Sequence, residues 1–82
     1  MDKYLGELLL GKAKECAIIY YEKHTIDSSQ FTINRIEKPA EIWGENILSW
    51  KYEAISKFLK QPLMIEVSID PDGYISANII EK

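Results

Sequence analysis

The sequence predicts an α+β domain in which a small antiparallel sheet of about four strands, arranged as two hairpins, carries two helices on one face. Two observations lead to this prediction. Apolar and polar residues alternate on both sides of a turn sequence near the C-terminus, and longer stretches before it carry apolar residues at intervals of three and four. The chain has 82 residues, so we expect a single domain over residues 1–82 with the element order α-β-β-α-β-β.

The first expected element is a helix over residues 2–15. Its apolar stripe consists of Leu5, Leu8, Leu9 and Ala13. Residues 16–26 are rich in β-branched and aromatic side chains, which favours a strand after the helix. The alternative is that the helix continues to Tyr20, since Cys16 and Ala17 extend the same stripe.

If residues 16–26 form a strand, a first hairpin follows from the next segment. Residues 30–36 are again rich in β-forming side chains, and Asp27-Ser28-Ser29 between the two segments suits a turn. We therefore expect the first hairpin over residues 16–36.

A second helix is expected over residues 46–62, where Pro62 would end it. Its apolar stripe, at spacings of four, three and four, consists of Leu48, Tyr52, Ile55 and Leu59. Its start is less defined and could reach back to residues 38–41, because proline suits the first turn of a helix.

The last hairpin has the clearest pattern. Apolar residues alternate on both sides of Asp70-Pro71-Asp72-Gly73, which has the residue preferences of a type I turn followed by a glycine. A three-residue loop would place Val67 opposite Ala77, whereas a loop of even length would place it opposite Ser76. Because the buried face fixes the register, we expect the three-residue loop.

Composition and charge restrict the cellular setting. The net charge is −3, from 13 acidic and 10 basic residues, and Cys16 is the one cysteine. An intramolecular disulfide is therefore impossible, which suits a reducing compartment such as the cytoplasm. No apolar run approaches the roughly 18–20 residues that span a bilayer, and the start of the chain does not resemble a signal peptide. We expect no association with membranes.

Two short motifs resemble binding loops, but each lacks a residue that the ligand requires. "GELLLGKA" approaches the phosphate-binding pattern, but Ala13 replaces the hydroxyl residue that binds Mg²⁺, and no strand precedes it. "SIDPDGYIS" approaches a calcium loop, but Ile79 stands where the bidentate glutamate should be. The sequence therefore predicts no cofactor and no metal.

Catalytic residues are also sparse. His24 and Cys16 are single representatives of their types, eight residues apart, without a local signature of a nucleophile and its base. A structural zinc site needs about four nitrogen or sulfur ligands, and the chain offers two. We expect a protein that is not an enzyme.

Aromatic side chains give the best indication of function. In the expected second helix, Trp43, Ile47, Trp50 and Ala54 form a second stripe, and tryptophan is a favoured interface residue. The acidic rim of this expected partner-binding patch consists of Glu41, Glu45 and Glu53. The sequence thus predicts a non-catalytic regulatory protein that binds and modulates a larger protein of unknown identity, for example as an inhibitor. A homodimer could use the same stripe or pair an edge strand.

The alternative function is binding of single-stranded nucleic acid. Aromatic side chains on a sheet can stack on bases, and the expected strands carry Tyr20, Tyr21, Phe31 and Tyr74. The acidic net charge and the single arginine make nucleic acid the less favoured partner.

Overall fold

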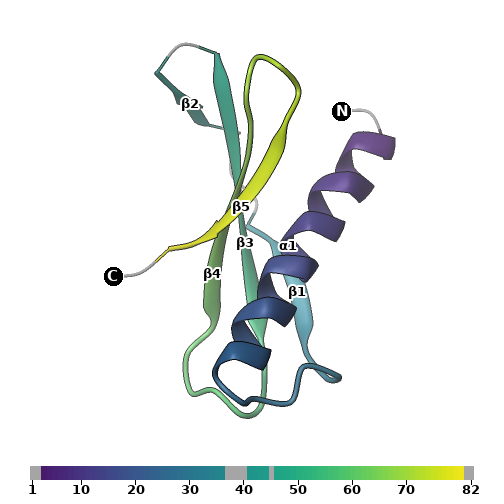
Figure 1. Ribbon diagram of the computed structural model, residues 1–82, viewed down its shortest axis with the longest axis vertical. Helices are drawn as coiled ribbons and strands as arrows, with labels where there is room; N and C mark the ends of the chain where they lie inside the picture. Colours follow the sequence, from purple (N-terminus) through teal and green to yellow (C-terminus); the bar gives the residue numbers. More distant parts are fainter. Residues whose placement is uncertain (1–2, 37–40, 45, 81–82) are drawn as a thin grey trace.

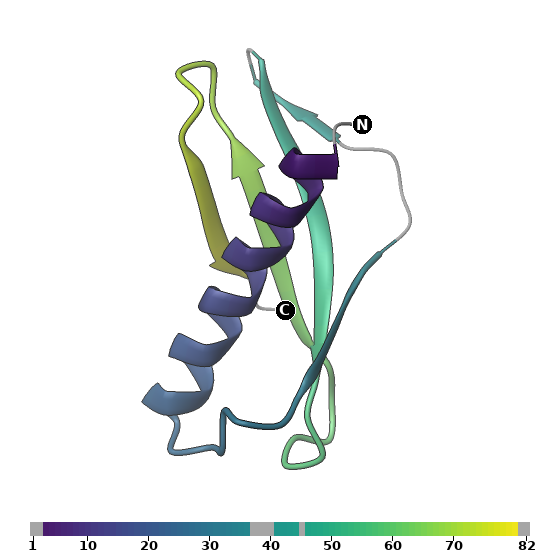
Figure 2. The ribbon, with the colours of Figure 1, turned by 90° about the vertical axis from the view of Figure 1, so that its right-hand side faces the viewer.

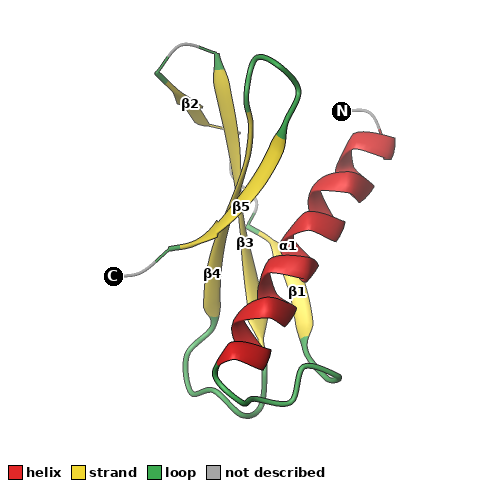
Figure 3. Cartoon of the chain, in the orientation of Figure 1, coloured by secondary structure: helices red, strands yellow, loops and turns green. Residues whose placement is uncertain are grey.

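The structure is a computed structural model that describes residues 3–36, 41–44 and 46–80, and it shows one helix and a five-stranded antiparallel sheet (Figures 1 and 3). The elements are α1 (Lys3–Lys23), β1 (Thr32–Arg35), β2 (Glu41–Trp43), β3 (Ile47–Ile55), β4 (Leu63–Ile69) and β5 (Ile75–Ile79). The α+β class and the antiparallel sheet are confirmed. The expected order with two helices is wrong for the described residues, where one helix precedes all the strands.

The sheet has the strand order β1-β3-β4-β5, and every pair is antiparallel. The short strand β2 pairs with the first part of β3 and β1 pairs with its last part, so β1 and β2 share one edge of the sheet. Among the described strands, β5 forms the opposite edge (Figure 2).

Helix α1 lies diagonally across one face of the sheet and packs mainly over β4 and β5 (Figure 2). The buried core between the two layers consists of Leu9, Ala13, Ala17 and Tyr21 from α1, Trp50, Tyr52 and Ala54 from β3, and Leu63, Ile65 and Val67 from β4. No described element packs on the other face, which we call the open face.

The continuation of α1 through residues 16–23 corrects the expectation of a strand there. Leu9, Ala13, Ala17 and Tyr21 follow one another at intervals of four and are all fully buried. A helix buries this entire stripe against the sheet, and that burial outweighs the β propensity of the intervening isoleucines. Asp27-Ser28-Ser29 consequently leads from α1 to β1, and no hairpin forms over residues 16–36.

A Schellman motif ends the helix. The Ile26 N–H donates to the Tyr21 carbonyl at 2.7 Å, and the Thr25 N–H donates to the Glu22 carbonyl at 3.1 Å. Thr25 has a φ of +55°, in the left-handed region that glycine usually occupies at this position. A β-branched residue is strained in this conformation.

Thr25→Gly is therefore expected to raise the free energy of unfolding by about 0.5–1 kcal/mol, because relief of the left-handed strain exceeds the entropy that glycine adds to the unfolded chain. Urea denaturation followed by circular dichroism measures the change. Thr25→Ala, which keeps a Cβ atom, should gain less. A Thr25→Gly variant that is less stable than the wild type would contradict the motif.

The second expected helix is also replaced by strand structure. Residues 47–55 form β3, in which Trp50, Tyr52 and Ala54 alternate onto the helix-facing side. β3 pairs on both edges, so its backbone is satisfied and its alternate side chains complete the core between β4 and α1. The segment 56–62, expected as the end of that helix, connects β3 to β4. The suggested helix start covers residues 38–41. Residues 38–40 lie outside the described residues, and Glu41 is the first residue of β2, so the described part of this start is strand.

The C-terminal hairpin confirms its expected register. Ile69 lies opposite Ile75, Val67 opposite Ala77 and Ile65 opposite Ile79. The Asp70 N–H donates to the Tyr74 carbonyl at 3.1 Å, the Gly73 N–H donates to the Asp70 carbonyl at 3.0 Å, and Gly73 has a φ of +89°. The loop of three residues is therefore closed by hydrogen bonds and needs its glycine.

Candidate protein-interaction site

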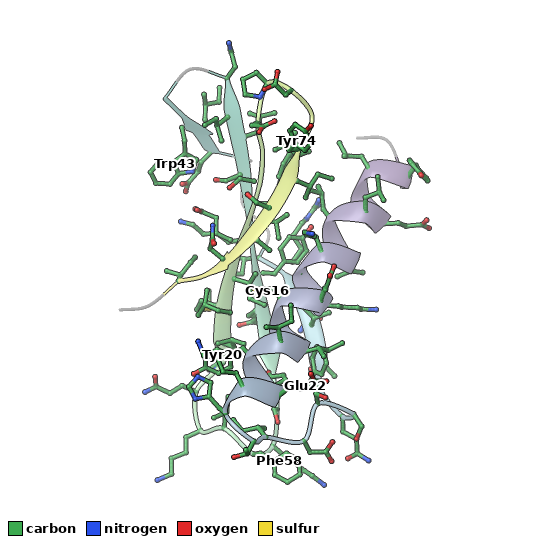
Figure 4. The ribbon with its side chains drawn as sticks, viewed as in Figure 1. Cys16, Tyr20, Glu22, Trp43, Phe58 and Tyr74 are labelled. Carbon is green, nitrogen blue, oxygen red and sulfur yellow. The ribbon has the colours of Figure 1, made fainter. Side chains whose placement is uncertain are left out.

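The β2–β3 hairpin places Trp43 on the open face. Trp43 lies opposite Ile47 and Glu41 opposite Ser49. Since Trp50 and Tyr52 face α1, the odd-numbered residues of β3 and their partners in β2 face the other way. Figure 4 shows Trp43 on the side of the sheet away from α1.

A hydrogen bond orients the indole of Trp43. Its Nε1–H donates to Ser49 Oγ at 2.5 Å. Ser49 is only 1% exposed although it lies on the uncovered face, whereas Trp43 remains 49% exposed. The indole thus presents a large apolar surface to solvent in a fixed orientation.

Three carboxylates share the open face with this tryptophan. Glu41 accepts from Lys51 Nζ at 3.3 Å, in an ion pair that joins β2 to β3 across the open face. Glu53 follows along β3, and Glu66 lies opposite Lys51 in the register of β3 and β4. The described strands therefore bring three carboxylates and one ammonium group to this face, which makes it acidic.

The structure brings together four of the six residues expected in the patch. Trp43, Ile47, Glu41 and Glu53 share the open face. Trp50 does not, because it lies on the helix-facing side and is 7% exposed, within the core. Glu45 lies outside the described residues.

Three residues on this face, Ser49, Lys51 and Glu66, were missed by the helical interpretation. The sequence did carry one signal for them. Gly44 and Asn46, which have φ values of +52° and +66°, belong to residue types that tolerate the left-handed region. "WGENI" is therefore a hairpin signal that would have placed Trp43 opposite Ile47.

The aromatic residues expected for base stacking do not form a platform on the sheet. Tyr20 and Tyr21 belong to α1, and Tyr21 is fully buried with its ring 5.3 Å from that of Phe31. Tyr74 lies in the exposed end of the β4–β5 hairpin (Figure 4). Trp43 is the aromatic side chain that the described strands place on the open face.

Cys16 and His24 both line a groove of about 440 Å³ between α1 and β5. Burial raises the pKa of the Cys16 thiol, although the nearby charge of Lys12 opposes this shift. A raised pKa keeps the thiol protonated at neutral pH, which makes it a weak nucleophile. The His24 ring lies against Tyr20, with 4.3 Å between the ring centroids.

Within the described part of the chain, no cluster of three or more histidine, cysteine or acidic side chains is placed to bind a metal ion. None of the described helical structure is both long and apolar enough to cross a membrane.

The fold and the open face define the protein as a small α+β domain, with one helix on an antiparallel sheet and a half-exposed tryptophan on the uncovered side. Comparison of the chain with protein-family models, with curated proteins and with solved structures found no match.

Proposed function

We propose that the protein is a non-catalytic interaction module that binds and modulates a larger protein through the open face of its sheet. Trp43 is the central contact of this surface. The observation that supports the proposal is the half-exposed indole, held by its hydrogen bond to the buried Ser49. Tryptophan is among the residues that dominate binding energies, and a side chain that is already oriented loses less entropy on binding.

The surroundings of Trp43 suggest the chemistry of the partner. Glu41, Glu53 and Glu66 give the open face an acidic character, and Glu41 forms an ion pair with Lys51. An apolar pocket for the indole with basic residues around it would complement this surface. Binding there would act sterically, since the domain would cover a surface of the partner, and inhibition is one such outcome.

The single cysteine suits a reducing compartment, so we place this function in the cytoplasm. Binding of single-stranded nucleic acid is the weaker alternative. Its expected aromatic residues lie in the helix, the core and a turn, and the face that carries Trp43 has three carboxylates. Phosphate groups would be repelled from such a face.

Trp43→Ala is expected to weaken partner binding by about thirtyfold or more, the loss typical of a dominant interface residue (about 2 kcal/mol). The tagged domain first captures its partner from native lysate, with and without nuclease and at low and high salt. The purified partner is then titrated against the wild type and the variant.

Ile42→Ala is the matched control. Ile42 is the neighbouring residue in β2, is 71% exposed, and points to the helix-facing side. The Ile42→Ala variant should bind the partner with the same affinity as the wild type. Equal losses in both variants, or a captured complex that nuclease removes, would contradict the role of Trp43.

A further inference from the structure

Within the described part of the sheet, β5 pairs with β4 on one side and has no strand on the other. The Tyr74 carbonyl accepts from the Asp70 N–H at 3.1 Å, and the Ile80 N–H donates to the Met64 carbonyl at 2.8 Å. Because bonded and outward-facing residues alternate in an antiparallel ladder, the even-numbered residues of β5 bond to β4. The residues whose N–H and C=O groups point to the free edge are Ile75, Ala77 and Ile79.

This edge lacks the features that usually prevent strands from pairing between molecules. Edge strands are commonly protected by charge, proline, a bulge or shortness. β1 and β2 divide the other edge into pieces of four and three residues, and they carry Arg35 and Glu41. β5 has five residues, with the sequence ISANI, and contains neither a charge nor a proline.

We propose that the protein forms a twofold-symmetric dimer in which β5 pairs with β5 of a second copy, antiparallel and centred on Ala77. In this register, each outward-facing residue of one copy meets an outward-facing residue of the other. Ala77 lies opposite Ala77 of the second copy and Ile75 opposite its Ile79, which gives about six backbone hydrogen bonds. The two sheets become one.

The side chains of β5 are complementary to themselves in this register. On the helix-facing side, isoleucine meets isoleucine and the small Ala77 lies on the axis. On the open face, Ser76 lies opposite Asn78 of the second copy, and both side chains are exposed in the monomer. Apolar residues therefore meet apolar residues and polar residues meet polar ones, as an interface between identical patches requires.

The position of α1 also suits this dimer. The helix packs mainly over β4 and β5, and strands lie about 4.8 Å apart. A helix axis above the middle of that pair would lie about 4.8 Å from the twofold axis, so the two helices would be about 10 Å apart, close to the distance at which helices pack. The second helix would cover Ile19, which lines the groove beside β5 and is 60% exposed.

Charges along the groove favour the antiparallel arrangement. Glu7, Lys12 and Glu15 lie beside the start of β5, next to Tyr74 and Ile75, and Lys12 pairs with Glu15 at 3.9 Å. Lys23 and His24 lie at the other end of the groove, which also contains Ile79. The end with two carboxylates and one ammonium group has a net negative charge, and the twofold axis would bring it toward Lys23 of the second copy, so these charges complement one another.

This inference goes beyond the proposed function because it uses the other edge of the sheet. β5 and β2 lie on opposite edges, and Trp43 faces away from α1. The dimer leaves both Trp43 surfaces free, so that it could bind a partner with two matching sites more tightly than one domain could.

Light scattering coupled to size-exclusion chromatography tests the dimer over a range of concentrations. The wild type is expected to approach twice the monomer mass of 9.5 kDa as its concentration rises. The double variant Ser76→Lys/Asn78→Lys places two pairs of like charges across the axis and should weaken the dimer about tenfold or more. A wild type that stays monomeric at millimolar concentration overturns the proposal.

The matched control is Ser76→Glu/Asn78→Lys, which places opposite charges across the same axis and should keep the dimer. Both double variants put the same lysine opposite Glu66 within the monomer. A difference between them therefore reports contacts across the axis, and circular dichroism checks that both fold. Equal dimer affinities in the two variants would overturn the β5 register.

The single cysteine allows an independent measurement. Cys16 lines the groove near the middle of α1 (Figure 4), so the two thiols would lie near the twofold axis. At alkaline pH, where the Cys16 thiol deprotonates despite its raised pKa, a short bismaleimide should crosslink the wild type and Ser76→Glu/Asn78→Lys into dimers, but not Ser76→Lys/Asn78→Lys. A crosslinking yield that is the same for all three proteins would contradict the proposal. Trp43→Ala should dimerise like the wild type, which separates this interface from the proposed partner surface.

Discussion

Trp50→Ala is expected to lower the free energy of unfolding by about 3–5 kcal/mol, whereas Trp43→Ala should lower it by only about 1 kcal/mol. The side chain of Trp50 is buried between β3, β4 and α1, so its removal leaves a cavity in the core. Trp43 is half exposed, and its removal costs one hydrogen bond and part of the cover over Ser49.

The size of the domain makes the first of these losses severe. A domain of 82 residues is expected to have about 4–12 kcal/mol of stability in total. With a urea m value of about 1.5 kcal/mol/M, the midpoint of Trp50→Ala should fall by about 2–3 M. Urea denaturation followed by circular dichroism measures both variants in the same way.

Tryptophan fluorescence provides a control for the two environments. Trp43→Phe leaves Trp50 as the single tryptophan, and its emission should lie at shorter wavelength than that of Trp50→Phe, which retains the exposed Trp43. The opposite order, or a larger loss of stability in Trp43→Ala than in Trp50→Ala, would contradict the assignment of the two residues to opposite faces.

The two tryptophans also show why the helical interpretation of residues 46–62 was wrong. A spacing of four keeps two residues on one face in a helix and in a strand alike, as for Leu48 and Tyr52. A spacing of three distinguishes the two structures. Ile47 and Trp50, which would share a helical face, lie on opposite faces of β3. The apolar stripe of residues 46–62 therefore distinguished a helix from a strand less well than its length suggested.

The C-terminal hairpin could be predicted because its determinants are local. The turn residues Asp70 and Gly73 lie between two short alternating strands, and only one loop length aligns their apolar residues. The end of α1 depended on distant contacts instead. Both conformations of residues 16–22 satisfy local preferences, and the choice is made by burial of Ala17 and Tyr21 against strands that follow later in the chain.

In the candidate site, too, local features could be predicted from the sequence, whereas contacts between strands could not. The residue types around Trp43 could be read from the sequence, and Glu41, Ile47 and Glu53 do lie on its face of the sheet. The contacts that shape the site could not be read in this way. The Trp43–Ser49 hydrogen bond and the Glu41–Lys51 ion pair arise from the register of β2 with β3.

Ile18→Pro is the second variant expected to have a large effect, a loss of about 3 kcal/mol or more. Residue 18 lies inside α1, between the buried residues Ala17 and Tyr21. Proline there removes the hydrogen bond to the preceding turn, and its ring collides with the carbonyl four residues earlier. The kink would move Tyr21 away from Phe31, whose ring it contacts. Thermal and urea denaturation, together with the ellipticity at 222 nm, measure the loss.

Ile18→Ala is the control that makes this test specific for a helix. Ile18 is half-buried, so its truncation removes a modest apolar contact, while alanine gains helix propensity. The two effects should nearly cancel, within about 0.5 kcal/mol. In a strand, the same change would lower both β propensity and packing, and it would destabilise the domain by about 1 kcal/mol. A near-neutral Ile18→Ala beside a severely destabilised Ile18→Pro is therefore the result that only a continuous α1 explains. If both variants destabilise the domain, the result would instead favour a strand over residues 16–22.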